Sequence, residues 1–406
     1  MKGDVYIMNN TQKLAERGSK VIMNTYSRFP IAFDHGKGMY VWDMDGKKYL
    51  DFVAGIAVNS LGYSNEKLGR KIAEQSMKLM HVSNLYYTEP QIELAEMLCN
   101  NSCFDKVFFC NSGAETIEAA LKIARKYAVM KNKPGRDIIT MEKSFHGRTY
   151  GAVTATGQDK YHKGLDPLLP GVKHVPFNDF EALKNAVDEN TCGILLEPIQ
   201  GEGGIRPADK EYLEKVRALC DEKDIVLLFD EVQCGVGRTG YLFAYQAYGV
   251  EPDGACFAKG LAGGIPIGAF MAKDKLACAF QPGDHASTFG GNPFATSAGT
   301  VVMDELLHEG ILDNVKKQGK LLTEKLNELK AKHSIIADVR GMGLIQGIEL
   351  TIPAGDVIAD CINNGLLLVG AGANVIRFVP ALIVSEKEIN EAMEILDKCL
   401  TNAENK

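Results

Sequence analysis

The sequence has 406 residues, of which 46% are apolar and 24% charged, and its formal net charge is −7. This composition is that of an ordinary globular protein of two or three domains, and the modest negative charge, without a Lys/Arg-rich tract, excludes nucleic acid as an expected partner. No run approaches the roughly eighteen apolar residues of a membrane span, and residues 1–10 lack the pattern of a secretory signal, so we expect a cytoplasmic protein without a membrane partner.

The first predicted elements are short strands and turns between residues 29 and 51. Residues 39–43 alternate between apolar and polar side chains, which predicts a strand, and Asp45-Gly46 predicts the hairpin turn that follows. We assign residues 1–66 to the N-terminal segment of a small domain.

From about residue 68 the pattern changes to short apolar runs that alternate with helices. This alternation predicts an α/β fold with a mostly parallel, doubly wound sheet, whose strands are expected at 107–110, 137–140, 193–196, 225–229 and 255–257, with a helix at about 114–130. We assign residues 67–295 to this large domain.

The remaining residues, 296–406, are expected to complete the small α+β domain. Helices are predicted at about 295–307, 313–333 and 387–400, and strands at 342–350, 366–369 and 375–378.

Polar side chains interrupt apolar runs at the ends of two of the predicted strands. Asp230 follows residues 225–229 and needs a cationic partner, such as a pyridinium nitrogen; a helix N-cap or an Asp-Glu metal pair is the alternative. Lys259 follows residues 255–258 and precedes a glycine-rich loop. Burial lowers the pKa of a lysine and makes its amine nucleophilic, although a surface lysine at the start of a loop is the alternative.

Residues 111–114 (NSGA) lie at a predicted strand-to-helix junction. The free N–H groups of a first helical turn bind anions, and a single phosphate fits better than a nucleotide because neither Gly-rich nucleotide motif is present. The alternative is that Ser112 only caps the helix.

Three further side chains have the chemistry of a substrate site. Phe145 could stack on a planar ring and Arg148 could bind a carboxylate, but a packing aromatic and a surface ion pair are equally expected. Arg377 lies in an apolar strand and needs an anionic partner, for which Glu202 is a candidate. The spacing of histidines and of the ten cysteines predicts neither a metal site nor a disulfide framework, and no G-x-S-x-G motif suggests a serine hydrolase.

Taken together, residues 26–382 resemble the class-III (fold type I) aminotransferases. The resemblance is carried by residues 230–233 (DEVQ), by Lys259 twenty-nine positions later, and by residues 287–293 (STFGGNP). It implies a large domain with a mostly parallel seven-stranded sheet, a smaller α+β domain built from both termini, and pyridoxal 5′-phosphate as the cofactor.

The resemblance also implies roles for individual residues. Lys259 would bind the cofactor as a Schiff base and move a proton, and Asp230 would pair with the pyridine nitrogen. The other implied cofactor-binding positions are Ser112, Gly113, Ala114, Phe145, Glu231, Val232, Gln233 and Thr288. Thr288 would come from the neighbouring subunit, which implies a homodimer with shared active sites.

Substrate binding is implied for Tyr26, Arg148, Glu202, Ser287 and Arg377. Arg377 would hold the α-carboxylate of 2-oxoglutarate or glutamate, and Glu202 would cover it while the ω-amino donor is bound. Arg148 would hold the carboxylate of that donor.

Within the family, the likeness is greatest to the acetylornithine aminotransferases, on residues 55–59 (GIAVN) and 81–91 (HVSNLYYTEPQ). This implies small-molecule substrates, namely N-acetylornithine and 2-oxoglutarate, and a place in arginine biosynthesis. The same chemistry on succinyl-diaminopimelate, ornithine or 4-aminobutyrate, an aminomutase, and a non-catalytic phosphate-ligand binder stay open as alternatives. Residues 62–66 (GYSNE) depart from the Gly-His-x-His-Pro that the family usually has.

Overall fold

A seven-stranded sheet forms the centre of the larger of two lobes in the computed structural model, which describes residues 9–405. Its strands lie in the order β4 (Lys106–Cys110), β12 (Gly268–Ala272), β11 (Gly254–Phe257), β10 (Val226–Asp230), β7 (Thr191–Leu196), β5 (Asp137–Met141) and β6 (Val172–Val175). Within this sheet only β12 is antiparallel to its neighbours. The prediction of a mostly parallel α/β sheet is confirmed.

The sheet is covered on both faces, which explains why its central strands are apolar at every position. All residues of β7 and β10 are buried. On one face, Ile117, Leu121 and Ala124 of α5 (Gly113–Met130) pack against the sheet, as the helical spacing predicts. On the other face, α8 (Lys210–Lys223) contributes Tyr212 and Leu213.

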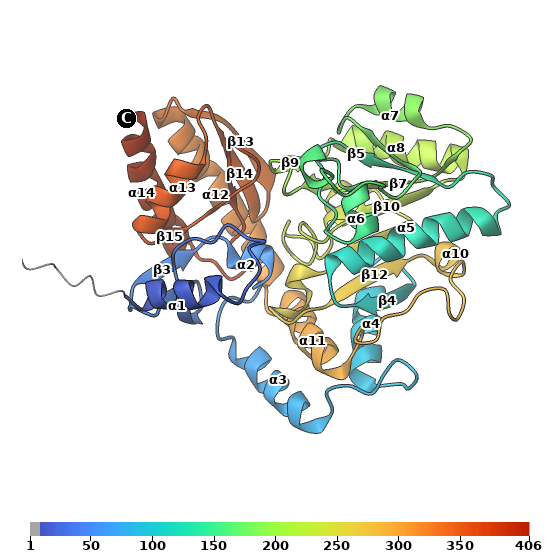
Figure 1. Ribbon diagram of the computed structural model, residues 1–406, viewed down its shortest axis with the longest axis horizontal. Coiled ribbons are helices and arrows are strands. Elements are labelled where there is room, and N and C mark those ends of the chain that lie inside the picture. The colour runs from blue at the N-terminus through green and yellow to red at the C-terminus, as the bar shows by residue number, and fades with distance from the viewer. Residues whose placement is uncertain (1–8, 406) are drawn as a thin grey trace, which may run out of the picture.

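The smaller lobe is built from both ends of the chain. Strands β1 (Phe33–Lys37), β2 (Tyr40–Asp43) and β3 (Lys48–Asp51) form an antiparallel meander, and β3 pairs in parallel with β15 (Leu366–Leu367). Figure 1 shows these N-terminal elements beside the C-terminal helices. The predicted hairpin turn is present, because Gly46 adopts a φ of 85° and its N–H donates to the Asp43 carbonyl.

A second sheet completes this lobe, and the remaining elements connect the two lobes or surround them. The order of the sheet is β13 (Ile336–Met342), β14 (Ile345–Leu350), β17 (Val375–Phe378) and β16 (Val369–Gly370). Helices α12 (Ile311–Lys332) and α13 (Gly355–Asn363) pack against it, and α14 (Glu386–Glu404) packs on these two helices. The other elements are α1 (Asn10–Ser19), α2 (Ala54–Ala57), α3 (Glu66–Lys78), α4 (Glu89–Asn100), α6 (Tyr150–Ala155), η1 (Asp159–Tyr161), α7 (Phe180–Ala186), β8 (Ile199–Gln200), β9 (Arg206–Pro207), α9 (Ala244–Tyr248), η2 (Lys259–Ala262), α10 (Asp274–Ala277) and α11 (Pro293–His308).

The structure differs from the predicted elements in several respects. The single strand expected at 366–369 is two short strands, β15 and β16, which belong to different sheets. The single strand expected at 342–350 begins only at Ile345, because Gly343, at a φ of 55°, turns the chain between β13 and β14. Strands β6 and β12 were not predicted, since one is short and polar and the other is rich in small residues without alternation. The domain boundaries at 66/67 and 295/296 stay a prediction. Within the described chain, no helix is both long and apolar enough to cross a membrane.

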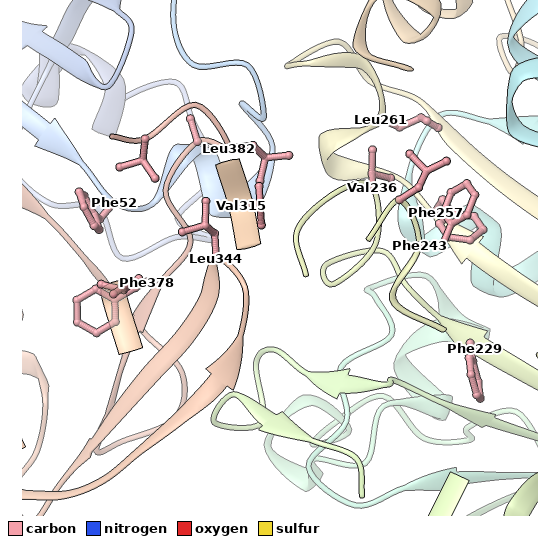
Figure 2. Close-up of a cluster of buried hydrophobic side chains, with 14 of the residues drawn as sticks. Phe52, Phe229, Val236, Phe243, Phe257, Leu261, Val315, Leu344, Phe378 and Leu382 are labelled. Carbon is pink, nitrogen blue, oxygen red and sulfur yellow. The ribbon is translucent and has the colours of Figure 1, made fainter. Parts of the chain in front are cut away.

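The two lobes share one hydrophobic core. Figure 2 shows Val315, Phe378 and Leu382 on the side of the smaller lobe and Phe243 and Phe257 on the other, all members of one contiguous cluster. Burial of such large apolar side chains contributes about 1.5–3 kcal/mol each and fixes the position of one lobe on the other.

A buried cation reinforces this junction. Arg238 lies in the loop after β10, is 2% exposed, and donates to the backbone carbonyls of Leu344 and Pro380 in the smaller lobe. No carboxylate pairs with it among residues 9–405. The hydrogen bonds to these two carbonyls therefore compensate the cost of removing the Arg238 charge from water.

We expect Arg238→Ala to lower the free energy of unfolding by about 2–4 kcal/mol, because it leaves two buried carbonyls unpaired and a cavity between the lobes. Calorimetry should show a fall of several degrees in Tm. The exposed Arg70, which pairs with Glu66 one turn earlier in α3, is the matched control, and Arg70→Ala should leave Tm nearly unchanged. Equal Tm values for the two variants would contradict the role of Arg238.

Candidate active site

A cavity of about 360 Å³ lies where the parallel strands of the large sheet end. Its lining comes from residues 111–114 after β4, residues 145–147 after β5, Glu197 after β7, Asp230 of β10 and Lys259 after β11. Carboxyl ends of parallel strands meet at one edge of a sheet, and ligands bind there. Topology thus brings together side chains that are up to 148 positions apart in the sequence.

Asp230 is fixed at the end of β10 by two hydrogen bonds. Its Oδ1 accepts from the Val232 N–H at 2.9 Å, and its Oδ2 accepts from His146 Nδ1 at 2.7 Å. Burial by itself lowers the pKa of His146, but the hydrogen bond and charge of Asp230 outweigh it, so the pKa is raised overall. The hydrogen bond to His146 therefore fixes the orientation of the Asp230 carboxylate at the end of β10. Neither predicted alternative, a helix N-cap or a metal pair, is present: the described residues hold no cluster of three His, Cys, Asp or Glu side chains placed for a metal.

Lys259 opens the short helix η2 in a strained backbone conformation, with a φ of 41°. Its side chain is half-buried and lines the cavity, and within residues 9–405 its amine, desolvated by the protein around it, forms no hydrogen bond or ion pair. Burial lowers the pKa of this amine below its usual value, despite the opposing charge of Asp230. Lys259 is thus not the surface lysine of the alternative interpretation but a desolvated amine that faces a carboxylate.

The start of α5 forms an anion site beside these two residues. Ser112 caps the helix, its side chain accepting from the Glu115 N–H, and the N–H groups of Gly113 and Ala114 lie in the first turn, where no helical partner exists. A Cβ on Gly113 would lie 2.7 Å from Val232 Cγ1, so only glycine lets this turn approach the loop after β10. The structure thus shows the cap formed by Ser112, and anion binding at this turn stays a prediction.

Phe145 and Val232 both line the cavity, and Glu197 fixes the backbone that carries Phe145. The Phe145 N–H donates to Glu197 Oε2 at 3.1 Å, and the Gly201 N–H donates to Glu197 Oε1 at 3.3 Å. Burial raises the pKa of Glu197 to about 7, with the charge of His146 opposing the shift. Glu197 thereby joins the loop of Phe145 to the loop that carries Glu202.

Arg377 of β17 approaches the cavity from the smaller lobe. It is 1% exposed and donates through Nη1 to Gln233 Oε1 at 2.9 Å, while its Nη2 lies 3.5 Å from Glu202 Oε2. Its Nε has no partner within the described chain. Burial lowers the pKa of Arg377, and the charge of Glu202 opposes this. The predicted pairing of Arg377 with Glu202 is confirmed as a long, single contact.

Arg148 is exposed and has no ion pair among the described residues, unlike the surface pair considered from the sequence. Its guanidinium lies over the ring of Tyr161 at 3.9 Å and over that of Phe145 at 5.3 Å. A guanidinium stacked in this way keeps its N–H edges open to a carboxylate.

Seven of the residues singled out in the sequence are not among those that line the cavity: Arg148, Glu202 and Arg377, described above, and Glu231, Tyr26, Ser287 and Thr288. Glu231 points the opposite way from Asp230, because side chains alternate along a strand, and its carboxylate accepts from the Tyr245 N–H at the start of α9. This placement corrects the expectation that Glu231 contacts the cofactor. Tyr26 and Thr288 are exposed, and Ser287 Oγ accepts from Asn111 Nδ2 at the rim, 3.0 Å away. Ligand contacts of Tyr26, Ser287 and Thr288 stay predictions.

Three residues at the site were not predicted from the sequence: His146, Glu197 and Tyr161. His146 follows Phe145 after a predicted strand, and Glu197 ends another one, so the strand-end rule that selected Asp230 could have selected both. Nothing in the sequence around Tyr161 could have done so, since its position depends on packing.

The residues present fit pyridoxal 5′-phosphate, the cofactor that the resemblance implies. An unpartnered buried amine, a buried carboxylate for a ring nitrogen, an aromatic side chain and a helix N-terminus for a phosphate all border one cavity. Burying a lysine amine without a partner costs stability and gives the fold no structural benefit. A ligand that reacts with the amine would explain why Lys259 is placed in this way.

The comparisons with known proteins agree with this geometry. Residues 21–400 match the family described as aminotransferase class-III. Among curated proteins, the acetylornithine aminotransferases of Caldanaerobacter subterraneus subsp. tengcongensis and Clostridium acetobutylicum are 54% and 51% identical; the matches cover 94% and 93% of this chain and 98% of each relative.

Solved structures with similar folds include relatives with two different substrates in their names. The ornithine aminotransferase of Toxoplasma gondii superposes with a TM-score of 0.94 at 29% identity, over 98% of this chain and 96% of that one. The N-acetylornithine aminotransferase of Stenotrophomonas maltophilia superposes with a TM-score of 0.83 at 35% identity, over 96% and 98%.

We expect Lys259→Ala to abolish the near-visible absorbance of protein-bound pyridoxal phosphate, since the variant lacks the only amine that faces the cavity within the described residues. The spectrum should be recorded after reconstitution and gel filtration. Lys273→Ala is the control, because that lysine pairs with Glu251 at the surface and should leave the spectrum unchanged. A Lys259→Ala spectrum identical to that of the unmodified protein would refute the assignment.

Proposed function

The chain belongs to the class-III aminotransferases, and from this we propose that it transfers the terminal amino group of N-acetylornithine to 2-oxoglutarate, giving N-acetylglutamate 5-semialdehyde and glutamate. The observation that carries the proposal is that Lys259 and Asp230 line one cavity, whose lining residues Phe145 and Gln233 contact Arg148 and Arg377 respectively. Relatives named acetylornithine aminotransferase, at 48–54% identity, support the donor and a role in arginine biosynthesis. The cytoplasmic location expected from the sequence stays a prediction.

The cofactor of this class, pyridoxal 5′-phosphate, supplies when bound an electron sink that stabilises negative charge on the substrate carbon. Lys259 would hold it covalently, and its Nζ would then move the proton at the substrate carbon that carries the amino group. The lowered pKa of Lys259 favours the unprotonated amine, the form that can accept that proton. Asp230, oriented by its hydrogen bond with His146, would pair with the ring nitrogen and favour its protonated form.

The other cavity residues would orient the cofactor. The N–H groups of Gly113 and Ala114 would bind its phosphate, with Ser112 at the rim. Phe145 and Val232 would enclose the two ring faces, and Gln233 would approach the ring hydroxyl.

The two arginines would separate the two substrates of the reaction. Arg148 has open N–H edges at the mouth of the site and would bind the carboxylate of the donor. Arg377 lies deeper and would bind the α-carboxylate of 2-oxoglutarate, once Glu202 has moved away from it. A donor without a carboxylate near the reacting carbon leaves Glu202 in place.

The donor is inferred from sequence similarity and not from the fold. The ornithine aminotransferase of Toxoplasma gondii superposes with a higher TM-score than the N-acetylornithine aminotransferase of Stenotrophomonas maltophilia, 0.94 against 0.83, at about half the sequence identity of the curated relatives. Many substrates are served by one fold, so the higher identity over nearly the whole chain is the stronger support.

We further propose a homodimer in which Thr288 completes the phosphate site of the partner. Exposed apolar side chains support this, and those that flank Asn84 and Thr288 in the sequence, Leu85, Tyr87 and Phe289, are here called the patch. Asn84 ties the patch to the loop of Thr288, since its Nδ2 donates to the carbonyls of Ser287 and Gly290. Exposed apolar surface of this kind marks an interface, and here it adjoins the residue to be shared.

We expect N-acetylornithine to be the best amino donor when glutamate formation from 2-oxoglutarate is followed with a panel of donors at equal concentration. Its advantage in kcat/KM over ornithine should be at least about tenfold, the discrimination that one well-placed polar group supplies. The panel should include succinyl-diaminopimelate and 4-aminobutyrate, and a reaction without 2-oxoglutarate as the control for an aminomutase. If ornithine or 4-aminobutyrate is the faster donor, the substrate assignment is wrong.

We expect hybrid dimers to reveal the shared site. Lys259→Ala and Thr288→Ala chains, each weakly active at limiting cofactor, should recover activity when mixed under dissociating conditions and reassembled, because each hybrid holds one intact site. Random pairing restores about a quarter of the native sites. Each variant taken through the same treatment alone is the control. No recovery on mixing would mean that Thr288 acts in its own chain or not at all.

A further inference from the structure

Tyr161 lies between the two arginines and has no role in the function proposed above. It ends the short helix η1, is half-buried, and contacts both groups of the substrate site. Its ring lies under the Arg148 guanidinium at 3.9 Å and meets the Phe145 ring edge to face at 5.7 Å. Its hydroxyl donates to Glu202 Oε1 at 3.2 Å.

The position of Tyr161 is fixed by contacts that do not involve a ligand. Its N–H donates to the Gln158 carbonyl at 3.0 Å, and Gln158 Nε2 donates to the Ser144 carbonyl at 2.9 Å, which ties η1 to the loop of Phe145. The next residue, His162, bonds through Nε2 to the Val153 carbonyl at 2.8 Å. The tyrosine is therefore a rigid support and not a mobile side chain at the surface.

The hydroxyl contributes much of what holds Glu202 over Arg377. The ion pair itself is a single contact of 3.5 Å, longer than a charge-assisted hydrogen bond, and the Glu202 side chain is 27% exposed. Glu202 Oε1 points the other way and is held by Tyr161 alone among the described residues. Without that hydrogen bond, water would compete for the Glu202 carboxylate and the covering position would be less populated.

The ring contributes separately, through Arg148. No carboxylate among the described residues pairs with this guanidinium, so the two aromatic rings are what orient it. The contact with Tyr161 is the closer of the two. A pre-oriented guanidinium loses less entropy when it binds a carboxylate, so the stacked ring increases the affinity for the donor.

We propose that Tyr161 is a specificity-determining residue that divides the site between its two substrates. Its hydroxyl stabilises Glu202 in the position that excludes a carboxylate from Arg377, and its ring orients Arg148 for the carboxylate of the ω-amino donor. The inference rests on the proposed two-substrate function and adds a residue that sets the balance between the substrates. It acts by positioning Glu202 and Arg148, without itself taking part in the chemistry.

Tyr161→Phe tests the hydroxyl, because it removes the hydrogen bond to Glu202 and keeps the ring. Glutarate, a dicarboxylate with no keto group, is titrated calorimetrically into the cofactor-loaded enzyme, so that binding is measured without turnover. We expect the Kd of glutarate to fall about three- to tenfold, since Arg377 is uncovered more easily. The KM of the amino donor should change less than about twofold. An unchanged or higher Kd of glutarate overturns the role of the hydroxyl.

Tyr161→Leu tests the ring. We expect the KM of the amino donor to rise about tenfold in this variant, with Tyr161→Phe restoring it to the native value. A donor KM that changes less than twofold in Tyr161→Leu overturns the role of the ring. The near-visible spectrum of the bound cofactor and the Tm establish that both variants are folded and loaded.

Tyr150→Phe is the matched control. This tyrosine belongs to the same segment, and its hydroxyl donates to the Leu165 carbonyl, 2.9 Å away, instead of to Glu202. Its removal should change neither the Kd of glutarate nor the donor KM; a shift as large as that of Tyr161→Phe would overturn the proposal. The glutarate result does not depend on which amine is the donor. A donor panel that favours another amine would therefore refute the proposed substrate and leave this inference standing.

Discussion

The burial of an amine beside a carboxylate, without direct contact between them, is the constraint on which the rest of the site depends. Lys259 forms no hydrogen bond within the described chain, and Asp230 is occupied by His146 and by the Val232 N–H. Two groups that would gain from pairing are thus held apart, and the cavity between them is the space for a ligand. Such an arrangement lowers stability in the absence of a ligand and gives the amine the reactivity that the chemistry needs.

The large sheet meets this constraint through its topology. Six strands run the same way, so the loops that carry residues 111–114, 145–147, Glu197, Asp230 and Lys259 all open at one edge. Fully apolar strands, buried on both faces, cannot shift their register without burying a polar residue, which fixes the position of each strand end. The strained backbone of Lys259 is tolerated because the surrounding core leaves it no alternative.

The smaller lobe adds what the sheet cannot supply, a cation that approaches from the opposite side. Arg377 reaches the cavity on β17, and the shared hydrophobic core and Arg238 hold that strand in place. Glu202 contacts Arg377, and Tyr161 contacts both Glu202 and Arg148. The selection between the two substrates therefore depends on this short series of contacts at the mouth of the site. Chemistry and selectivity are therefore separable: the first resides at the strand ends, the second in the loops and the smaller lobe.

The sequence by itself determined the fold class and the reacting pair. Asp230 and Lys259 could be recognised because each ends an apolar run, and a charge is rarely buried at the end of a strand without a function. It also indicated the anion site at residues 112–114, but it placed Glu231 with Asp230, although alternation along the strand turns the two in opposite directions. Only the tertiary structure decided which side chains surround the pair. His146, Glu197 and Tyr161 act through contacts with residues 41 to 84 positions away, and such contacts depend on packing that no local pattern encodes.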